Sequence, residues 1–124
     1  MAYTIGWSDS EAQVADAEEA GTVLDRIIAD PKGPYLLHVI PPNDGSIMQL
    51  IWGDSERAAV MYSDDIEGGW GFEPSLPPLA KDIDCDYGSI EPDRTRVTVA
   101  AARQAVQEYV ATGRRPSNLS WLDE

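Results

Sequence analysis

The alternation of apolar and polar residues predicts a short strand and then a helix at the start of the chain. Residues 2–7 predict a strand at a sheet edge. From Ala20, apolar residues recur at offsets of three, four, seven and eight positions, as on one face of a helix. Asp16 suits the N-cap and Pro31 stops the helix, so we expect it to cover residues 17–29.

Three further apolar segments follow, separated by short turns. Residues 35–40 and 47–52 flank a turn at 41–45 that is rich in Pro, Asn, Asp and Gly, which is a hairpin signal. A second turn at 53–56 leads to a third apolar segment at 57–62. Connections this short imply an antiparallel meander, and the predicted helix can cover one of its faces.

The patterns in the next part of the chain are weaker. Residues 63–71 are rich in Gly and acids without a period, which predicts a loop, and residues 72–78 are proline-rich and predict irregular structure. Residues 82–87 alternate acidic and apolar positions, which predicts a half-exposed strand. Its inward residues would be Ile83, Cys85 and Tyr87. Residues 94–97 can add one more strand.

The last helix has the clearest signals. Thr98 is a suitable N-cap, an apolar stripe runs from Val99 to Val110, and Gly113 ends the helix. We found no repeat and no linker. The patterns together predict an α+β fold, in which an antiparallel meander sheet of about 4–6 strands packs against an N-terminal and a C-terminal helix, as a single domain over residues 1–124.

Acidic residues dominate the chain and are unevenly distributed. The net charge is −13; residues 1–93 hold 19 Asp and Glu against 4 Lys and Arg, whereas residues 94–124 hold 3 against 5. A phosphate backbone would be repelled, so we expect no nucleic-acid binding and instead a basic protein partner. The alternative is that the charge only keeps the protein soluble.

Composition favours a cytoplasmic protein with one core. No apolar run reaches the roughly 18 to 20 residues of a membrane span, and the N-terminus has no basic region followed by an apolar stretch. We therefore expect a cytoplasmic location without a membrane partner. The lone Cys85 cannot form an intramolecular disulfide, and we expect it to be a small buried thiol.

Groups that do chemistry are scarce. The chain lacks a P-loop, a dinucleotide-binding glycine motif, a nucleophile elbow and an H-E-x-x-H motif. His38 lies in an apolar segment, where a structural imidazole is expected. The run Asp82, Asp84 and Asp86 lacks the Gly and Glu of a calcium loop, because Tyr87 and Asp93 occupy those positions. We expect no catalytic residue, no metal and no cofactor.

One segment is more suggestive of recognition. Residues 64–70 combine carboxylates, glycines and an aromatic side chain, which can supply steering charge and a buried anchor together. The alternative is a solvated turn with its Trp folded into the core. The predicted binding residues are the anchors Tyr62 and Trp70, the steering acids Asp64, Asp65 and Glu67, and a second acidic patch of Asp82, Asp84 and Asp86.

The C-terminal segment resembles a known family. After the last helix come Arg114, Arg115, Pro116, a two-residue spacer, Leu119, Ser120 and Trp121. This pattern is similar to the closing segment of the type-one immunity proteins of bacterial polymorphic toxin systems. The strand that ends in Tyr62 and Asp64, followed by a glycine-bearing loop, is also similar. The family-motif residues Arg115, Pro116, Leu119 and Trp121 are expected to be architectural.

The resemblance implies an α+β immunity protein without enzymatic activity. Such a protein binds and neutralises a toxin encoded by an adjacent gene, in this family often a nucleic-acid deaminase or a nuclease. We expect an acidic face to occlude a basic surface of that toxin, with the immunity protein a monomer or in a 1:1 complex. Two alternatives remain open: a non-enzymatic regulatory or ligand-binding domain with another partner, and a small hydrolase that uses paired acids or a metal.

Overall fold

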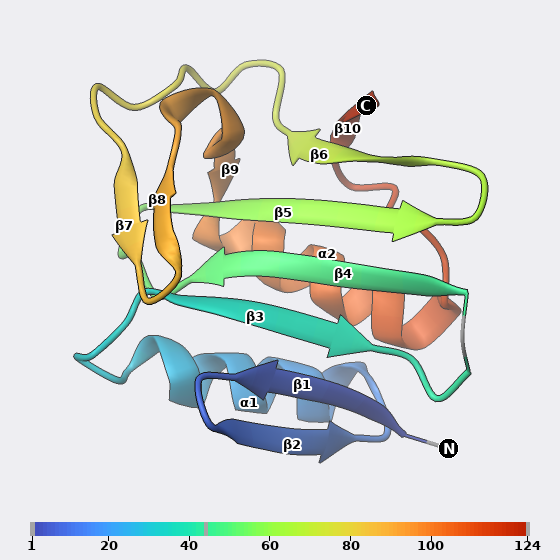
Figure 1. Cartoon of the computed structure of the whole chain (residues 1–124). Coiled ribbons are helices and arrows are strands. Elements are labelled where there is room, and N and C mark those ends of the chain that lie inside the picture. Colours follow the sequence, from blue (N-terminus) through green and yellow to red (C-terminus); the bar gives the residue numbers. More distant parts are fainter. Residues whose placement is uncertain (1, 44, 124) are drawn as a thin grey trace.

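The computed structural model describes residues 2–43 and 45–123, so Met1, Glu124 and Asp44 of the predicted turn lie outside the described residues. Two helices lie behind one antiparallel sheet in the view of Figure 1. In the part of the chain that is described, the main sheet has eight strands, with the order β10-β6-β5-β4-β3-β1-β2 and with β9 paired to β5. These strands are β1 (Tyr3–Trp7), β2 (Ser10–Val14), β3 (Tyr35–Ile40), β4 (Ser46–Trp52), β5 (Arg57–Asp64), β6 (Gly68–Phe72), β9 (Val97–Thr98) and β10 (Ser120–Asp123).

The two predicted helices are confirmed, and their caps explain their bounds. Helix α1 (Ala17–Ile28) begins after Asp16, whose carboxylate accepts a hydrogen bond from the backbone N–H of Glu19 at 2.9 Å. Helix α2 (Val99–Thr112) begins after Thr98, whose hydroxyl accepts from the N–H of Ala101 at 3.2 Å. It ends at Gly113, which has φ 71°, a left-handed conformation that favours glycine.

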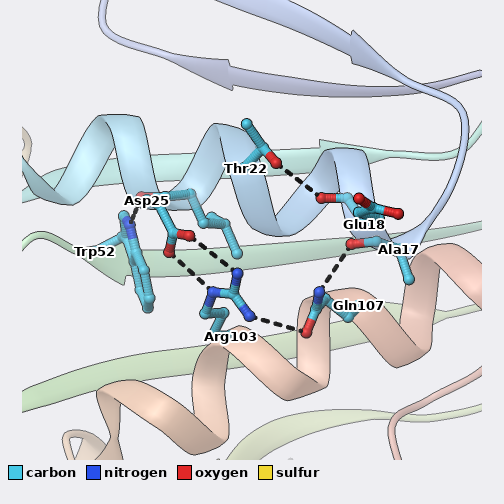
Figure 2. A network of polar contacts seen from close by, with 8 residues as sticks. Ala17, Glu18, Thr22, Asp25, Trp52, Arg103 and Gln107 are labelled. Atoms are coloured by element: carbon cyan, nitrogen blue, oxygen red, sulfur yellow. Dashed lines mark hydrogen bonds and ion pairs between the residues drawn. The ribbon is translucent and has the colours of Figure 1, made fainter.

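A polar network joins the two helices where they pass closely. Arg103 of α2 donates to Asp25 of α1 from Nε at 2.9 Å and from Nη2 at 3.0 Å (Figure 2). Gln107 donates to the carbonyl of Ala17 at 2.9 Å. A side chain at Gly21 would place its Cβ 2.7 Å from Arg103, so the glycine makes room for this network.

The main core lies between the helices and one face of the sheet. At one end of this core Trp52 is 1% exposed, and its indole N–H donates to the carbonyl of Leu24 at 2.8 Å. At the other end, Tyr109 of α2 packs edge-on against Tyr3 and Tyr62, with ring centroids 5.5 and 5.9 Å away. The α+β class and the meander between an N-terminal and a C-terminal helix are therefore confirmed, although the sheet is larger than expected.

The N-terminal strand is not at the sheet edge, which corrects one prediction. Strand β1 pairs with β3 on one side and with β2 on the other, so β2 is the outer strand. Strand β2 has the sequence Ser-Glu-Ala-Gln-Val, with Ala12 and Val14 as its apolar positions. Its alternation is too short and too polar to predict a strand without knowledge of its partner.

The segment at 63–71 is a hairpin and not a loop. Strand β5 continues to Asp64, and the glycine-rich segment from Gly68 forms β6 and pairs with β5 and β10. Glycine at position 71 has a packing reason, because a Cβ there would lie 2.7 Å from Leu119 Cδ1. The tail packs directly on the backbone of this strand.

A second hairpin covers part of the opposite face of the sheet. Strands β7 (Ile83–Cys85) and β8 (Gly88–Ile90) form a separate two-stranded sheet in front of β4 and β5 (Figure 1). Ile83 packs with Ile51 and Ala59 in a small second core. The predicted strand is confirmed over Ile83–Cys85 with Ile83 inward, but its extension to residue 87 with Tyr87 inward is wrong, because Tyr87 lies in the turn and is 83% exposed.

The strand predicted over residues 94–97 is confined to Val97–Thr98. Pro92–Arg94 forms a turn of 3₁₀ helix, η1, and the strand pairing is confined to β9, where Val97 lies opposite Ala58. Neither α1 nor α2, within the described residues, is long and apolar enough to cross a membrane.

Candidate functional site

The turn between β5 and β6 is held together by Asp64. Its Oδ1 accepts hydrogen bonds from the backbone N–H groups of Ile66 and Glu67, both at 2.8 Å, and its Oδ2 accepts from the Tyr62 hydroxyl at 2.7 Å. The Tyr62 hydrogen bond, followed by those backbone donors, lowers the pKa of Asp64 below its ordinary value. The carboxylate of Asp64 therefore points into the turn.

Tyr62 is buried on the helix side of the sheet. It is 3% exposed, and burial, followed by the bond to Asp64, raises the pKa of its hydroxyl. Its neighbour across the strands is Gly69, whereas Met61 lies opposite Trp70. Because successive side chains of a strand point to opposite faces, Tyr62 and Trp70 lie on different faces of the sheet.

The outer part of the turn is formed by Asp65, Ile66 and Glu67, which we call the acidic tip. All three residues are exposed, and Ile66 is 93% exposed. Glu67 also lies 3.4 Å from a guanidinium nitrogen of Arg115. The sequence-based interpretation passed over Ile66, although a large apolar residue between carboxylates in a turn is itself a signal of an exposed contact.

Trp70 is half-buried on the open face of the sheet, the face that the helices do not cover. The guanidinium of Arg94 lies over its ring at 4.5 Å from the centroid. The ring also packs against the second core. Trp70 therefore lies within strand β6 and packs on the sheet, whereas the acidic tip lies in the turn, so the two do not form a single recognition loop.

The three acids of the second predicted patch have different surroundings. Asp84 accepts from the Ser89 hydroxyl at 2.6 Å within the β7–β8 hairpin. Asp86 reaches back to the main sheet and accepts from the backbone N–H of Leu36 at 2.9 Å. Asp82 precedes β7, and all three residues are exposed. Asp82 lies before the β7–β8 hairpin, Asp84 lies in β7 and Asp86 lies in the turn, so the three residues do not form a row of carboxylates along one strand.

No group of three or more His, Cys, Asp or Glu that could hold a metal ion occurs among the residues described. His38 lies on the open face, and Cys85 is half-buried beside the second core.

The tail after α2 closes on itself and on the sheet. The Trp121 indole N–H donates to the carbonyl of Pro116 at 2.9 Å, and the Arg115 guanidinium lies 5.4 Å from the Trp121 ring. Leu119 is buried against Gly71. The carboxylate of Glu108 accepts hydrogen bonds from the backbone and the hydroxyl of Ser117. These contacts fix the last strand beside β6.

Comparison with known proteins identifies the family. The family model described as Immunity protein Imm1 matches residues 8–123, so the match includes the β5–β6 turn, the β7–β8 hairpin and the tail. No curated protein matches the chain. The match confirms the resemblance that the tail motif and the strand ending in Tyr62 suggested.

Proposed function

Because the chain belongs to the Imm1 family of immunity proteins, which act against toxins, we propose that it binds its cognate toxin through an acidic surface and blocks access to the toxin's substrate. The protein has no enzymatic role of its own in this scheme. It acts in the cytoplasm as a monomer that forms a 1:1 complex with the toxin.

The observation that carries this proposal is the acidic tip. Asp65 and Glu67 flank Ile66, the most exposed large apolar side chain that the structure describes. The flanking carboxylates attract a basic partner at long range, and the apolar side chain loses water on contact. The bonds made by Asp64 fix the turn before binding, which lowers the entropy lost in the complex.

The charge of the protein favours a toxin that acts on nucleic acid. A deaminase or a nuclease needs a basic surface to bind phosphates, and a protein of net charge −13 competes for that surface. Attraction of this kind accelerates association by about 10 to 10³-fold at low salt. Occlusion of the phosphate-binding surface would then prevent the toxin from reaching its substrate.

The first test uses the product of the gene adjacent to the one that encodes this chain. We expect an inactivated form of that product to co-purify with the immunity protein, and the active form to arrest growth unless the immunity protein is co-expressed. Failure of the wild-type protein both to bind and to protect would overturn the proposed function.

A charge reversal tests the acidic tip. Asp65→Lys is expected to slow association about tenfold at low salt and to flatten its salt dependence. Glu56→Lys is the matched control, because Glu56 is also an exposed turn acid but lies at the opposite end of β5. Asp64 is left unchanged, since its replacement would disturb the turn. Equal association rates for both variants would remove the tip from the interface.

A further inference from the structure

A groove of about 880 Å³ lies on the open face of the main sheet. Its floor includes Gly6 of β1, His38 of β3 and Gln49 of β4, which lie in one row across the paired strands. One wall is the β1–β2 turn, and the other is the tip of the β7–β8 hairpin, which projects over the sheet at that end (Figure 1). Two chain segments far apart in sequence therefore enclose one binding surface.

The walls of the groove are acidic and its surface is partly apolar. Asp9 and Glu11 lie on the first wall and Asp86 on the second, and no Lys or Arg is among the described residues that line the groove. The exposed apolar groups are Ile40, at 46%, and Tyr87, at 83%. This combination suits a cationic side chain with an apolar stem, because carboxylates and an aromatic ring both attract a guanidinium or ammonium group.

The second wall is fixed in place before any partner binds. Asp86 accepts from the N–H of Leu36 through Oδ1, and its own N–H donates to the carbonyl of Pro34 at 3.2 Å. Both bonds join the hairpin tip to the start of β3. The position of Tyr87 over the sheet thus follows from backbone contacts of its neighbour, and a partner meets a preformed groove.

Gly6 keeps the floor of the groove low. The φ angle of Gly6 is not in the positive region that favours glycine. A Cβ added at this position would meet nothing closer than the Ser10 carbonyl at 3.9 Å. Neither backbone conformation nor packing therefore requires glycine at this strand position. Because glycine has no side chain, the space above this position is part of the groove.

From this geometry we infer that the groove is the seat of a basic segment of the toxin, with an Arg or Lys side chain placed between the acidic walls and against Tyr87. The inference rests on the proposed function and names a part of the same interface. Gln49 in the groove floor lies three residues from Ser46, which pairs with Asp64 at the start of the β5–β6 turn, so the two sites are about 10 Å apart along the strands. A standard interface of about 800 Å² per partner is about 30 Å across, so one toxin surface can contact both the groove and the acidic tip.

The test uses one variant that adds a side chain to the groove floor and one that removes a side chain from its wall. Binding of each variant to the inactivated product of the adjacent gene is measured by titration calorimetry. Gly6→Leu fills the floor, and Tyr87→Ala removes the exposed ring. Each change is expected to weaken binding about tenfold or more, as for the central residues of an interface. Ala100→Leu is the matched control, because it adds the same side chain at an exposed position of α2, on the other side of the sheet, and is expected to bind as the wild type does.

The outcomes separate the groove from the function. If the wild type binds and both groove variants bind equally well, the inference is overturned while the proposed function stands. If the wild type neither binds nor protects cells, the proposed function itself falls. Should Gly6→Leu fail to fold by circular dichroism, Tyr87→Ala decides the question, because this exposed side chain contributes little to the core.

A third variant tests the chemistry of the occupant. Asp9→Lys places a cation on the first wall and is expected to weaken binding most at low salt. If Tyr87→Ala weakens binding but Asp9→Lys leaves it unchanged at every salt concentration, the groove does not receive a basic segment, and the proposed occupant is wrong.

Discussion

The two faces of the main sheet are built from alternate residues of the same strands, yet they differ in what covers them. The helix side is closed and apolar, whereas part of the open face is covered by the β7–β8 hairpin and by Leu79 of the segment before it, which pack on Ile51 and Ala59. The rest of the open face mixes His38 and Gln49 with half-buried apolar groups. A single strand thus stabilises the fold with one set of side chains and presents the other set on the less covered face.

The largest effect on stability should come from the closed face. Trp52→Ala removes a side chain that is almost fully buried, leaves a cavity and removes the hydrogen bond to the Leu24 carbonyl. We expect a loss of about 3 to 5 kcal/mol in the free energy of unfolding, measured by urea denaturation. A loss below about 1 kcal/mol would show that the helix layer does not depend on this contact.

Two consecutive residues of β4 compare the faces directly. Leu50 points to the core and Gln49 to the open face. Leu50→Ala is expected to cost about 2 to 5 kcal/mol in stability, and Gln49→Ala about 0.5 kcal/mol or less. Urea titrations of both variants check the difference. Equal losses of stability in the two variants would contradict the conclusion that the helix-covered face stabilises the fold more than the open face does.

A pH titration tests how the acidic tip is tied to the closed face. The bond from Tyr62 holds the folded-state pKa of Asp64 below its ordinary value. The stability that this carboxylate contributes is present above its unfolded pKa and is lost as the pH falls through the lower, folded value. Asp64→Asn should therefore be less stable than the wild type at pH 7.

That difference should shrink as the solution is acidified, because the wild-type carboxylate then becomes protonated in the folded protein. Chemical denaturation of both proteins between pH 7 and pH 2 measures it. Since all other acidic groups are common to the two proteins, their contributions cancel. A difference that stays constant across this range would contradict a role for the charge of Asp64.

A small effect is also expected in the polar contact between the two helices. The Arg103–Asp25 pair joins α1 to α2, but its side chains are 37% and 59% exposed. The hydrogen bond from Arg103 lowers the pKa of Asp25, yet solvent screens the pair. Arg103→Gln should cost about 1 kcal/mol or less in stability, as measured by thermal unfolding. A larger loss would mean that polar contacts, and not the shared core, hold the helices together.

Local signals were sufficient for the helices and for the central strands. Asp16, Thr98 and Gly113 satisfy the backbone at helix ends by themselves, so these ends follow from neighbouring residues. The apolar segments of β3, β4 and β5 are joined by short turns, which leaves antiparallel pairing as the simple solution. The tail motif likewise identified the family before any contact was known.

The missed elements depend on contacts with other segments, which lie next to β2 in the chain but far from β6 and from the second hairpin. Strand β2 is too polar to be predicted alone and forms because β1 offers it a backbone edge. Strand β6 has glycine at position 71 because Leu119, about fifty residues later, packs on it. The turn of the second hairpin needs Gly88, at φ 147°, and the contact of Asp86 with Leu36. Periodicity describes the exposure pattern of one segment and does not reveal any of these contacts.

The sequence by itself determined the α+β class, the two helices with their caps, the acidic character and the family, because caps, periods and charge counts are properties of adjacent residues. Only the tertiary structure decided which carboxylates are available to a partner. It turned Asp64 inward, placed Tyr62 and Trp70 on opposite faces, and brought Asp9 and Asp86 to the walls of one groove. The physical reason is that exposure and proximity depend on strand pairing between distant segments, which the chain establishes only when it folds.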